Sequence, residues 1–141
     1  FIVTEYQVLE SRVLGADLIL LIVAALTDSQ LKDFYQLSTE LGMDVLVEVH
    51  DLDEAEKALN IGSKIIGVNS RNLKTLEVSE KTFELILPQL PESVLKVAES
   101  GISTGEQVAK VQALGAKAVL IGESLVKSGN PVHTINQLLN R

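Results

Sequence analysis

Two short segments of small residues suit the binding of a phosphate group. Ser100-Gly101-Ile102-Ser103 offers backbone N–H groups that Gly101 leaves accessible, and Ser100 adds a hydroxyl donor. Gly122-Glu123-Ser124 repeats this chemistry one unit later, and the Glu123 side chain is expected to point away from the anion. Glycine and serine are common in ordinary turns, so either segment alone carries little weight. Because the two follow consecutive apolar runs and precede helical patterns, the pair predicts a phosphate site.

Two glutamates end otherwise apolar runs: Glu48 in Leu46-Val47-Glu48-Val49 and Glu99 in Val97-Ala98-Glu99. Burial raises the pKa of a carboxyl group and suits it to proton transfer near neutral pH. A salt-bridged structural glutamate is the alternative, but no lysine or arginine lies near Glu48 in the sequence. We therefore predict that both carboxyl groups face one pocket. His50 is expected in a loop or in support of the site rather than in the reaction.

Asn69-Ser70-Arg71 follows another apolar run and adds two polar side chains at a strand end. An asparagine there can hold a hydroxyl or carbonyl group, and Arg71 can bind a carboxylate or phosphate through two hydrogen bonds. A capping asparagine and a solvated arginine explain the same residues equally well. His133, in the last helical pattern, is expected to be structural or exposed.

One short motif, a glycine between the end of a helix and the start of an apolar run, occurs four times. Its copies are Leu14-Gly15-Ala16-Asp17, Leu41-Gly42-Met43-Asp44, Ile61-Gly62-Ser63-Lys64 and Leu114-Gly115-Ala116-Lys117. The glycine is expected in the left-handed conformation just past each helix. A chain built this way is an α/β protein with a parallel sheet, and its chemistry lies at the carboxyl ends of the strands.

Five apolar runs are predicted as buried strands: Leu18–Ala24, Val45–Val49, Lys64–Val68, Val94–Ala98 and Ala118–Ile121. A doubly wound sheet would fit the repeat, but it usually carries a G-x-G-x-x-G turn, which this sequence lacks. A TIM barrel often places a phosphate site after its last two strands. We therefore predict one α/β domain over residues 1–141, an incomplete parallel (β/α)8 barrel with five strands and six helices.

Polar residues mark where the helices begin. Thr27-x-x-Gln30 and Ser103-x-x-Glu106 have the spacing of a capping box. Asp51 or Asp53 is expected to cap the helix after the second strand, and Asn130-Pro131 is expected to begin the last helix.

Two further helices are predicted from apolar spacing. The first covers Glu5 to Leu14, with its apolar side chains facing inward: Val8, Leu9, Val13 and Leu14. The second surrounds Thr82–Leu87, and Pro88 and Pro91 end it before the next strand.

The composition argues against several functional classes. A net charge of −7 with only 4% aromatic residues disfavours a nucleic-acid surface. The absence of cysteine excludes thiol chemistry, and the two histidines lack the spacing of a metal site, so no metal is expected. No apolar run is long enough to cross a bilayer and no secretory signal is visible. We expect a cytoplasmic protein with no membrane partner.

The strand ends, taken in order, resemble those of the indole-3-glycerol-phosphate synthase family of tryptophan biosynthesis. The resemblance covers essentially the whole chain and rests on Leu20–Ala24, Val47–His50, Ile66–Leu73, Val97–Ile102 and Leu120–Leu125. It implies a (β/α)8 barrel and a carboxy-lyase acting on 1-(2-carboxyphenylamino)-1-deoxy-ribulose 5-phosphate. The reaction closes a ring with loss of CO2 and water to give indole-3-glycerol phosphate, without a metal or organic cofactor.

The resemblance also implies roles for individual residues. Glu48 would act as a proton-transferring base or shuttle, Asn69 would position the substrate, and Glu99 would line the reacting pocket. The remaining contacts would come from Arg71 and Ser100 for the substrate and from Gly101, Gly122 and the Glu123 backbone for the phosphate.

On the family pattern the chain starts just after the third strand, so the general-acid lysine of that strand is not among these residues. We expect the 141 residues alone to be inactive and to associate through open sheet edges. Two other interpretations stay open at this point. One is an inactive barrel piece, and the other is a different sugar-phosphate barrel such as an isomerase or epimerase.

Overall fold

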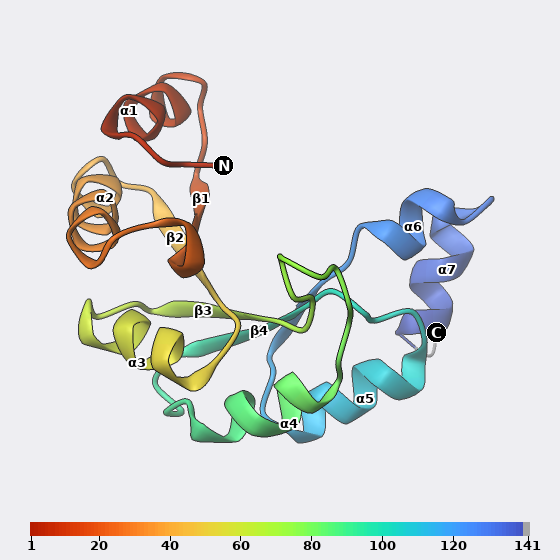
Figure 1. Cartoon of the computed structure of the whole chain (residues 1–141). Helices are drawn as coiled ribbons and strands as arrows, with labels where there is room; N and C mark the ends of the chain where they lie inside the picture. The colour runs from red at the N-terminus through yellow and green to blue at the C-terminus, as the bar shows by residue number, and fades with distance from the viewer. Residues whose placement is uncertain (140–141) are drawn as a thin grey trace.

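The computed structural model describes residues 1–139 and contains one parallel sheet (Figure 1). Its strands lie side by side in chain order, so each strand pairs with the next one along the sequence. The five strands are β1 (Leu18–Ile22), β2 (Asp44–Val49), β3 (Ile65–Asn69), β4 (Leu95–Glu99) and β5 (Ala118–Leu120). All five predicted strands are confirmed within a few residues. The first ends early because Val23–Ala25 form a 3-10 turn.

The described residues contain seven α-helices, one more than predicted, because the segment after β5 forms a short helix of its own. The helices are α1 (Glu5–Val13), α2 (Asp28–Glu40), α3 (Leu52–Asn60), α4 (Lys81–Ile86), α5 (Gly105–Ala113), α6 (Glu123–Lys127) and α7 (Pro131–Leu138). Helices α2 to α5 cover the outer side of the curved sheet (Figure 1). The fold is therefore an arc of the (β/α) barrel type.

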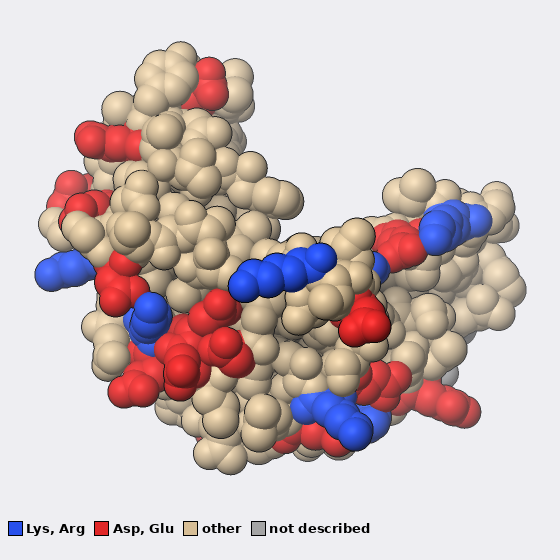
Figure 2. All heavy atoms as spheres, viewed as in Figure 1, with Lys and Arg blue, Asp and Glu red and all other residues tan. Residues whose placement is uncertain are grey.

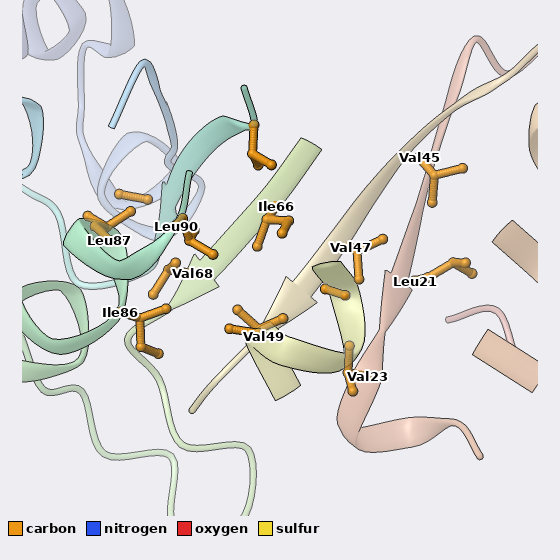
Figure 3. Packing of buried hydrophobic residues seen from close by; sticks show 14 of the residues in the cluster. Leu21, Val23, Val45, Val47, Val49, Ile66, Val68, Ile86, Leu87 and Leu90 are labelled. Atoms are coloured by element: carbon orange, nitrogen blue, oxygen red, sulfur yellow. The ribbon is translucent and has the colours of Figure 1, made fainter. Parts of the chain in front are cut away.

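The core lies between the sheet and its helices. Alternate side chains of each strand point into it, including Val45, Val47 and Val49 of β2 (Figure 3). Phe83 and Ile86 of α4 pack against this layer and are almost fully buried. Because strand side chains alternate between faces, the residues between these valines face the opposite, concave side of the sheet.

The glycine of the repeated motif has the predicted left-handed conformation in all four copies. Gly15, Gly42, Gly62 and Gly115 all have positive φ angles, between 77° and 102°. Each glycine follows the C-cap residue of a helix and leads directly into the next strand. The repeat therefore sets the short helix-to-strand connections that stack the units in order.

Side chains begin the helices largely as predicted. Thr27 and Gln30 form a capping box, Asp51 caps α3, and Asn130 caps α7 with Pro131 at its first turn. The capping box of α5 is one residue later than predicted. It uses Thr104 and Gln107, while the Ser103 backbone N–H donates to Gln107 Oε1 at 2.8 Å.

The predicted inward face of α1 is only partly correct. Val8 is fully buried, but Leu9 is 41% exposed and Val13 and Leu14 are more than three quarters exposed. Among the described residues α1 packs mainly against α2, and its other apolar side chains stay largely exposed.

The sheet does not close on itself within residues 1–139. β1 pairs only with β2, and β5 only with β4, so each has one unpaired edge in the described part. The outline is open between the parts around α1 and α6 in Figure 2, and basic and acidic residues are interspersed on that face. None of the described helices has the length and apolar character needed to span a membrane.

Candidate active site

The concave face of the sheet carries a thin apolar layer with polar groups at its carboxyl edge. Ile22, Leu46 and Val97 are buried but do not belong to the core under the helices. Beyond them lie Glu48 of β2, Asn69 of β3 and Glu99 of β4, all less than 8% exposed. The strand register places Asn69 opposite Glu99, and Glu48 opposite a glycine of β3. The three residues predicted to do chemistry are therefore neighbours.

Gly67 makes room for the carboxyl group of Glu99. A Cβ atom at position 67 would overlap Glu99 Oε1 and would lie 3.1 Å from Leu46 Cδ1. Since Gly67 stands on the strand between the two glutamates, the carboxyl group of Glu99 occupies the space where a side chain of β3 would otherwise project. The missing side chain is what allows the two carboxyl groups to influence each other.

His50 lies between two carboxylates. Its Nε2 is 3.2 Å from Glu48 Oε1, and its Nδ1 is 3.0 Å from Glu54 Oε2. The contact with Glu48 is close but is not aligned as a hydrogen bond. Within residues 1–139, three buried side-chain polar atoms have no hydrogen-bond partner: Glu48 Oε1, His50 Nε2 and Glu99 Oε1.

The environment moves the pKa values of the three titratable groups in different directions. Burial raises the pKa of Glu99 to about 8, and the nearby charge of Glu48 adds to this effect. Burial opposes ionisation of Glu48 as well, but polar contacts with His50, Asn69 and Glu99 outweigh it and lower the pKa. Contacts with Glu48 and Glu54 raise the pKa of His50 to about 9. At neutral pH, Glu48 is therefore ionised while Glu99 and His50 hold their protons.

The predicted phosphate-binding residues line one small cavity of about 90 Å³ at the ends of β4 and β5. Its lining includes Arg71, Ser100, Gly101, Gly122 and Glu123. The two segments predicted to form a cradle are therefore adjacent.

The turn after β4 is tightly fixed. Ser100 has a φ of 65° and Gly101 a φ of 69°, so two consecutive residues adopt the left-handed conformation. The Ser70 hydroxyl donates to the Ser100 carbonyl oxygen at 3.0 Å. A Cβ at Gly101 would overlap Val78 and would lie 3.0 Å from Ser70 Oγ, so this turn accepts no larger residue without movement.

The Glu123 carboxylate binds two cations at the edge of this cavity. Its Oε2 is 2.6 Å from Arg71 Nη2, and its Oε1 is 2.6 Å from Lys127 Nζ. Arg71 also donates to the Leu76 carbonyl oxygen at 3.2 Å. The guanidinium group predicted to bind substrate therefore has an anionic partner in this structure.

Sequence reasoning did not find the contact between Glu48 and His50 or the role of Glu54. A signal was available, because residues two apart on an extended strand lie on the same face. His50 and Glu54 are also four residues apart across the start of α3, a spacing that brings side chains together. His133 lies in α7 and is exposed, as predicted.

A larger surface hollow, of about 530 Å³, lies elsewhere. It is formed by α2 and α3 on the helix side of the sheet, between residues such as Tyr35 and Lys57. None of the three polar strand-end residues lines it, so its size does not make it the chemical centre.

Comparison with known proteins identifies the family of this chain. The family model described as indole-3-glycerol phosphate synthase matches residues 1–138. A protein of that name from a Nocardioides species is 49% identical over 138 residues, which is 98% of this chain and 53% of that protein. One from an Arthrobacter species is 51% identical over 131 residues, 93% of this chain and 48% of that protein. The chain thus spans about half the length of these relatives.

Solved structures support the barrel-type fold. A thiamine phosphate pyrophosphorylase from Pyrococcus furiosus matches with a TM-score of 0.74 at 16% identity, over 94% of this chain and 62% of that one. At this identity the likeness concerns the fold alone. The match of the family model over nearly all of the sequence, together with relatives at about half identity, is much more specific. The chain therefore belongs to the indole-3-glycerol phosphate synthase family.

Proposed function

We propose that the protein is an indole-3-glycerol-phosphate synthase, a carboxy-lyase of tryptophan biosynthesis in the cytoplasm. Its substrate would be 1-(2-carboxyphenylamino)-1-deoxy-ribulose 5-phosphate, which loses CO2 and water as the new ring closes. The observation that carries this proposal is the grouping of Glu48, Asn69 and Glu99 at the carboxyl edge of the sheet. At the same edge, the ends of β4 and β5 border the small cavity predicted to bind phosphate.

The different protonation states of the two glutamates suit this reaction. Glu48 is ionised at neutral pH and can accept a proton as the ring is formed and becomes aromatic. Glu99 holds its proton and can donate a hydrogen bond to an oxygen of the substrate. Asn69, opposite Glu99 in the register, can hold a hydroxyl group between them. Two neighbouring carboxyl groups with separated pKa values are a common arrangement for acid–base work.

The phosphate end of the substrate would lie in the cavity between the turns after β4 and β5. Backbone N–H groups of Gly101, Gly122 and Glu123 would provide donors, and Ser100 would lie beside the reacting part. Arg71 would assist by exchanging its contact with the Glu123 carboxylate for one with the substrate.

The loss of water needs a general acid at the other side of the substrate. No lysine contributes to the environment of Glu48 or Glu99 within the described residues. By family resemblance this acid would be a lysine outside the 141 residues. We therefore propose that these residues supply the base, the positioning amide and the phosphate cradle, and that by themselves they do not complete the reaction.

A binding experiment tests this proposal on the 141-residue chain. Indole-3-glycerol phosphate is added during recording of amide and carboxyl NMR spectra, with glycerol 3-phosphate as the control ligand. We expect both ligands to shift the amides of Gly101 and Gly122, and only the indole compound to shift the carboxyl signals of Glu48 and Glu99. Unmoved signals at all four residues would contradict the proposal. Indole-3-glycerol phosphate formed from the substrate by this chain alone would contradict the need for an additional acid.

A further inference from the structure

Glu54 holds His50 at two points, and the other ring nitrogen of His50 lies close to Glu48. The backbone N–H of His50 donates to Glu54 Oε2 at 2.8 Å, its ring Nδ1 is 3.0 Å from the same oxygen, and its Nε2 is 3.2 Å from Glu48 Oε1. The side chains of His50 and Glu54 are only 15% and 17% exposed, and that of Glu48 only 5%. An imidazole whose Nδ1 and backbone N–H both contact Glu54 cannot rotate freely, so its Nε2 stays next to the Glu48 carboxylate.

The support behind this ring is also rigid. Only His50 and Asp51 separate the end of β2 from the start of α3. The Asp51 side chain accepts the Glu54 backbone N–H at 2.8 Å as the N-cap of the helix. Glu54 is therefore fixed by the first turn of α3, and its side chain reaches back to the strand end.

We propose that His50 is a positioning residue for Glu48: held by Glu54, its ring fixes the Glu48 carboxylate beside Asn69 and Glu99. This inference rests on the proposed function, in which Glu48 is the base. His50 acts through Glu48 and does not touch the substrate. Asp51, Glu54 and His50 together form a clamp that ties the base to the start of α3.

The charges around the ring explain why a histidine suits this position. The groups that influence its charge are Glu48 from β2 and Glu54 from α3, and on the far side of Glu48 stands Glu99 from β4. A protonated imidazole between the first two stabilises Glu48 as an anion, which in turn favours the proton on Glu99. The clamp thus keeps the two carboxyl groups in different protonation states and assigns the base to Glu48.

The test is an NMR titration of the 141-residue chain that follows the side-chain carboxyl carbons and the histidine rings. It compares the unmodified protein with His50→Gln and with His133→Gln, a control variant in exposed α7. In His50→Gln we expect the titration midpoint of Glu48 to rise by about one pH unit or more. In His133→Gln we expect no change. An unchanged Glu48 midpoint in folded His50→Gln overturns the proposal.

A second variant covers the case in which His50→Gln does not fold. Glu54→Gln keeps both His50 and a side-chain oxygen acceptor but removes one charge. We expect the His50 midpoint to fall and the Glu48 carboxyl signal to shift, while the Asp51 cap and the helix remain. Unchanged signals of both residues overturn the proposal. No substrate is present, so the titration decides on the clamp while ligand binding and product formation decide separately on the proposed function.

Discussion

At the scale of single residues, the site depends on one carboxyl group that keeps its proton and one that loses it. Glu99 is 2% exposed, lies over Gly67 and is next to an ionised neighbour, Glu48. Each of these features disfavours a charge on Glu99. The proton on Glu99 is therefore part of the folded state, and the stability of the protein must depend on pH.

Replacing Glu99 by glutamine should alter this dependence. The pKa of Glu99 is about 8 in the folded protein and near 4.5 when unfolded. Between these values only the folded state holds the proton, so the free energy of unfolding falls as pH rises from 5 to 8. In wild type this decrease in the free energy of unfolding should be on the order of a few kcal/mol, and we expect it to be absent in Glu99→Gln.

Urea unfolding at several pH values measures this effect. His50, whose pKa is about 9, adds a separate fall above its ordinary pKa of 6.5, and this fall should persist in Glu99→Gln. Parallel curves for the two proteins between pH 5 and pH 8 would show that Glu99 is not protonated in the folded state.

A side chain at Gly67 should displace the Glu99 carboxyl group and lower the stability of the protein. Gly67→Ala places a Cβ where Glu99 Oε1 lies and close to Leu46, so the carboxyl group must move. Overpacking of this kind costs about 1–3 kcal/mol of stability. Chemical denaturation measures the loss, and Gly129→Ala, whose added Cβ would meet open space, is the matched control. Equal stability of both variants would contradict the tight packing of Glu99 over β3.

At the scale of elements, the ion pair between Arg71 and Glu123 joins the loop after β3 to the start of α6, past the end of β4. We expect Glu123→Gln to strengthen the binding of inorganic phosphate about threefold to tenfold, because Arg71 loses an anionic competitor. Phosphate titration followed by the Gly101 amide signal measures the change. Leu85→Gln, at an exposed position of α4, is the control. Weaker phosphate binding in Glu123→Gln would show that Glu123 does not compete with phosphate for Arg71.

The elements themselves could be predicted where one local signal was sufficient. Apolar runs located the strands, and glycine after each helix located the connections, because both depend on neighbouring residues only. The α5 cap was misplaced since Ser103 and Thr104 both offer a hydroxyl and an acidic or amide side chain three residues later. The inward face of α1 was only partly correct, with Val8 buried and Val13 exposed, because the exposure of these side chains depends on tertiary contacts.

In the candidate site as well, some features could be predicted from local sequence and others could not. Glu48, Asn69 and Glu99 could be predicted as neighbours because parallel strands bring their carboxyl ends to one edge. Composition and apolar pattern predicted neither the clamp at His50 nor the ion pair at Arg71. The spacing of Glu48, His50 and Glu54 offered a signal for the first, but no local signal exists for the Arg71 contact, which joins residues 52 positions apart.

At the scale of the whole molecule, residues 1–139 leave apolar surface near β1. Val13 and Leu14 at the end of α1 are 85% and 80% exposed, and Leu18 at the start of β1 is 44% exposed. Contiguous apolar surface next to an unpaired strand edge favours association. We expect the 141-residue chain to form dimers or larger species at micromolar concentration.

Sedimentation velocity measures this association. Val13→Lys introduces a charge into the apolar surface and should weaken association by about tenfold, roughly 1.4 kcal/mol. Leu85→Lys, at a position 55% exposed on α4, is the control and should leave it unchanged. A monomer at all concentrations would contradict the prediction.

The strict chain-order pairing of β1 to β5 has a consequence for how the protein comes apart. Each unit is stabilised by its two nearest neighbours, as in a solenoid, so opening proceeds by fraying inward from the outer units. β2, β3 and β4 are the last to lose their partners, and these strands carry Glu48, Asn69 and Glu99. The proposed site at the strand ends therefore lies in the part of the sheet that we expect to open last.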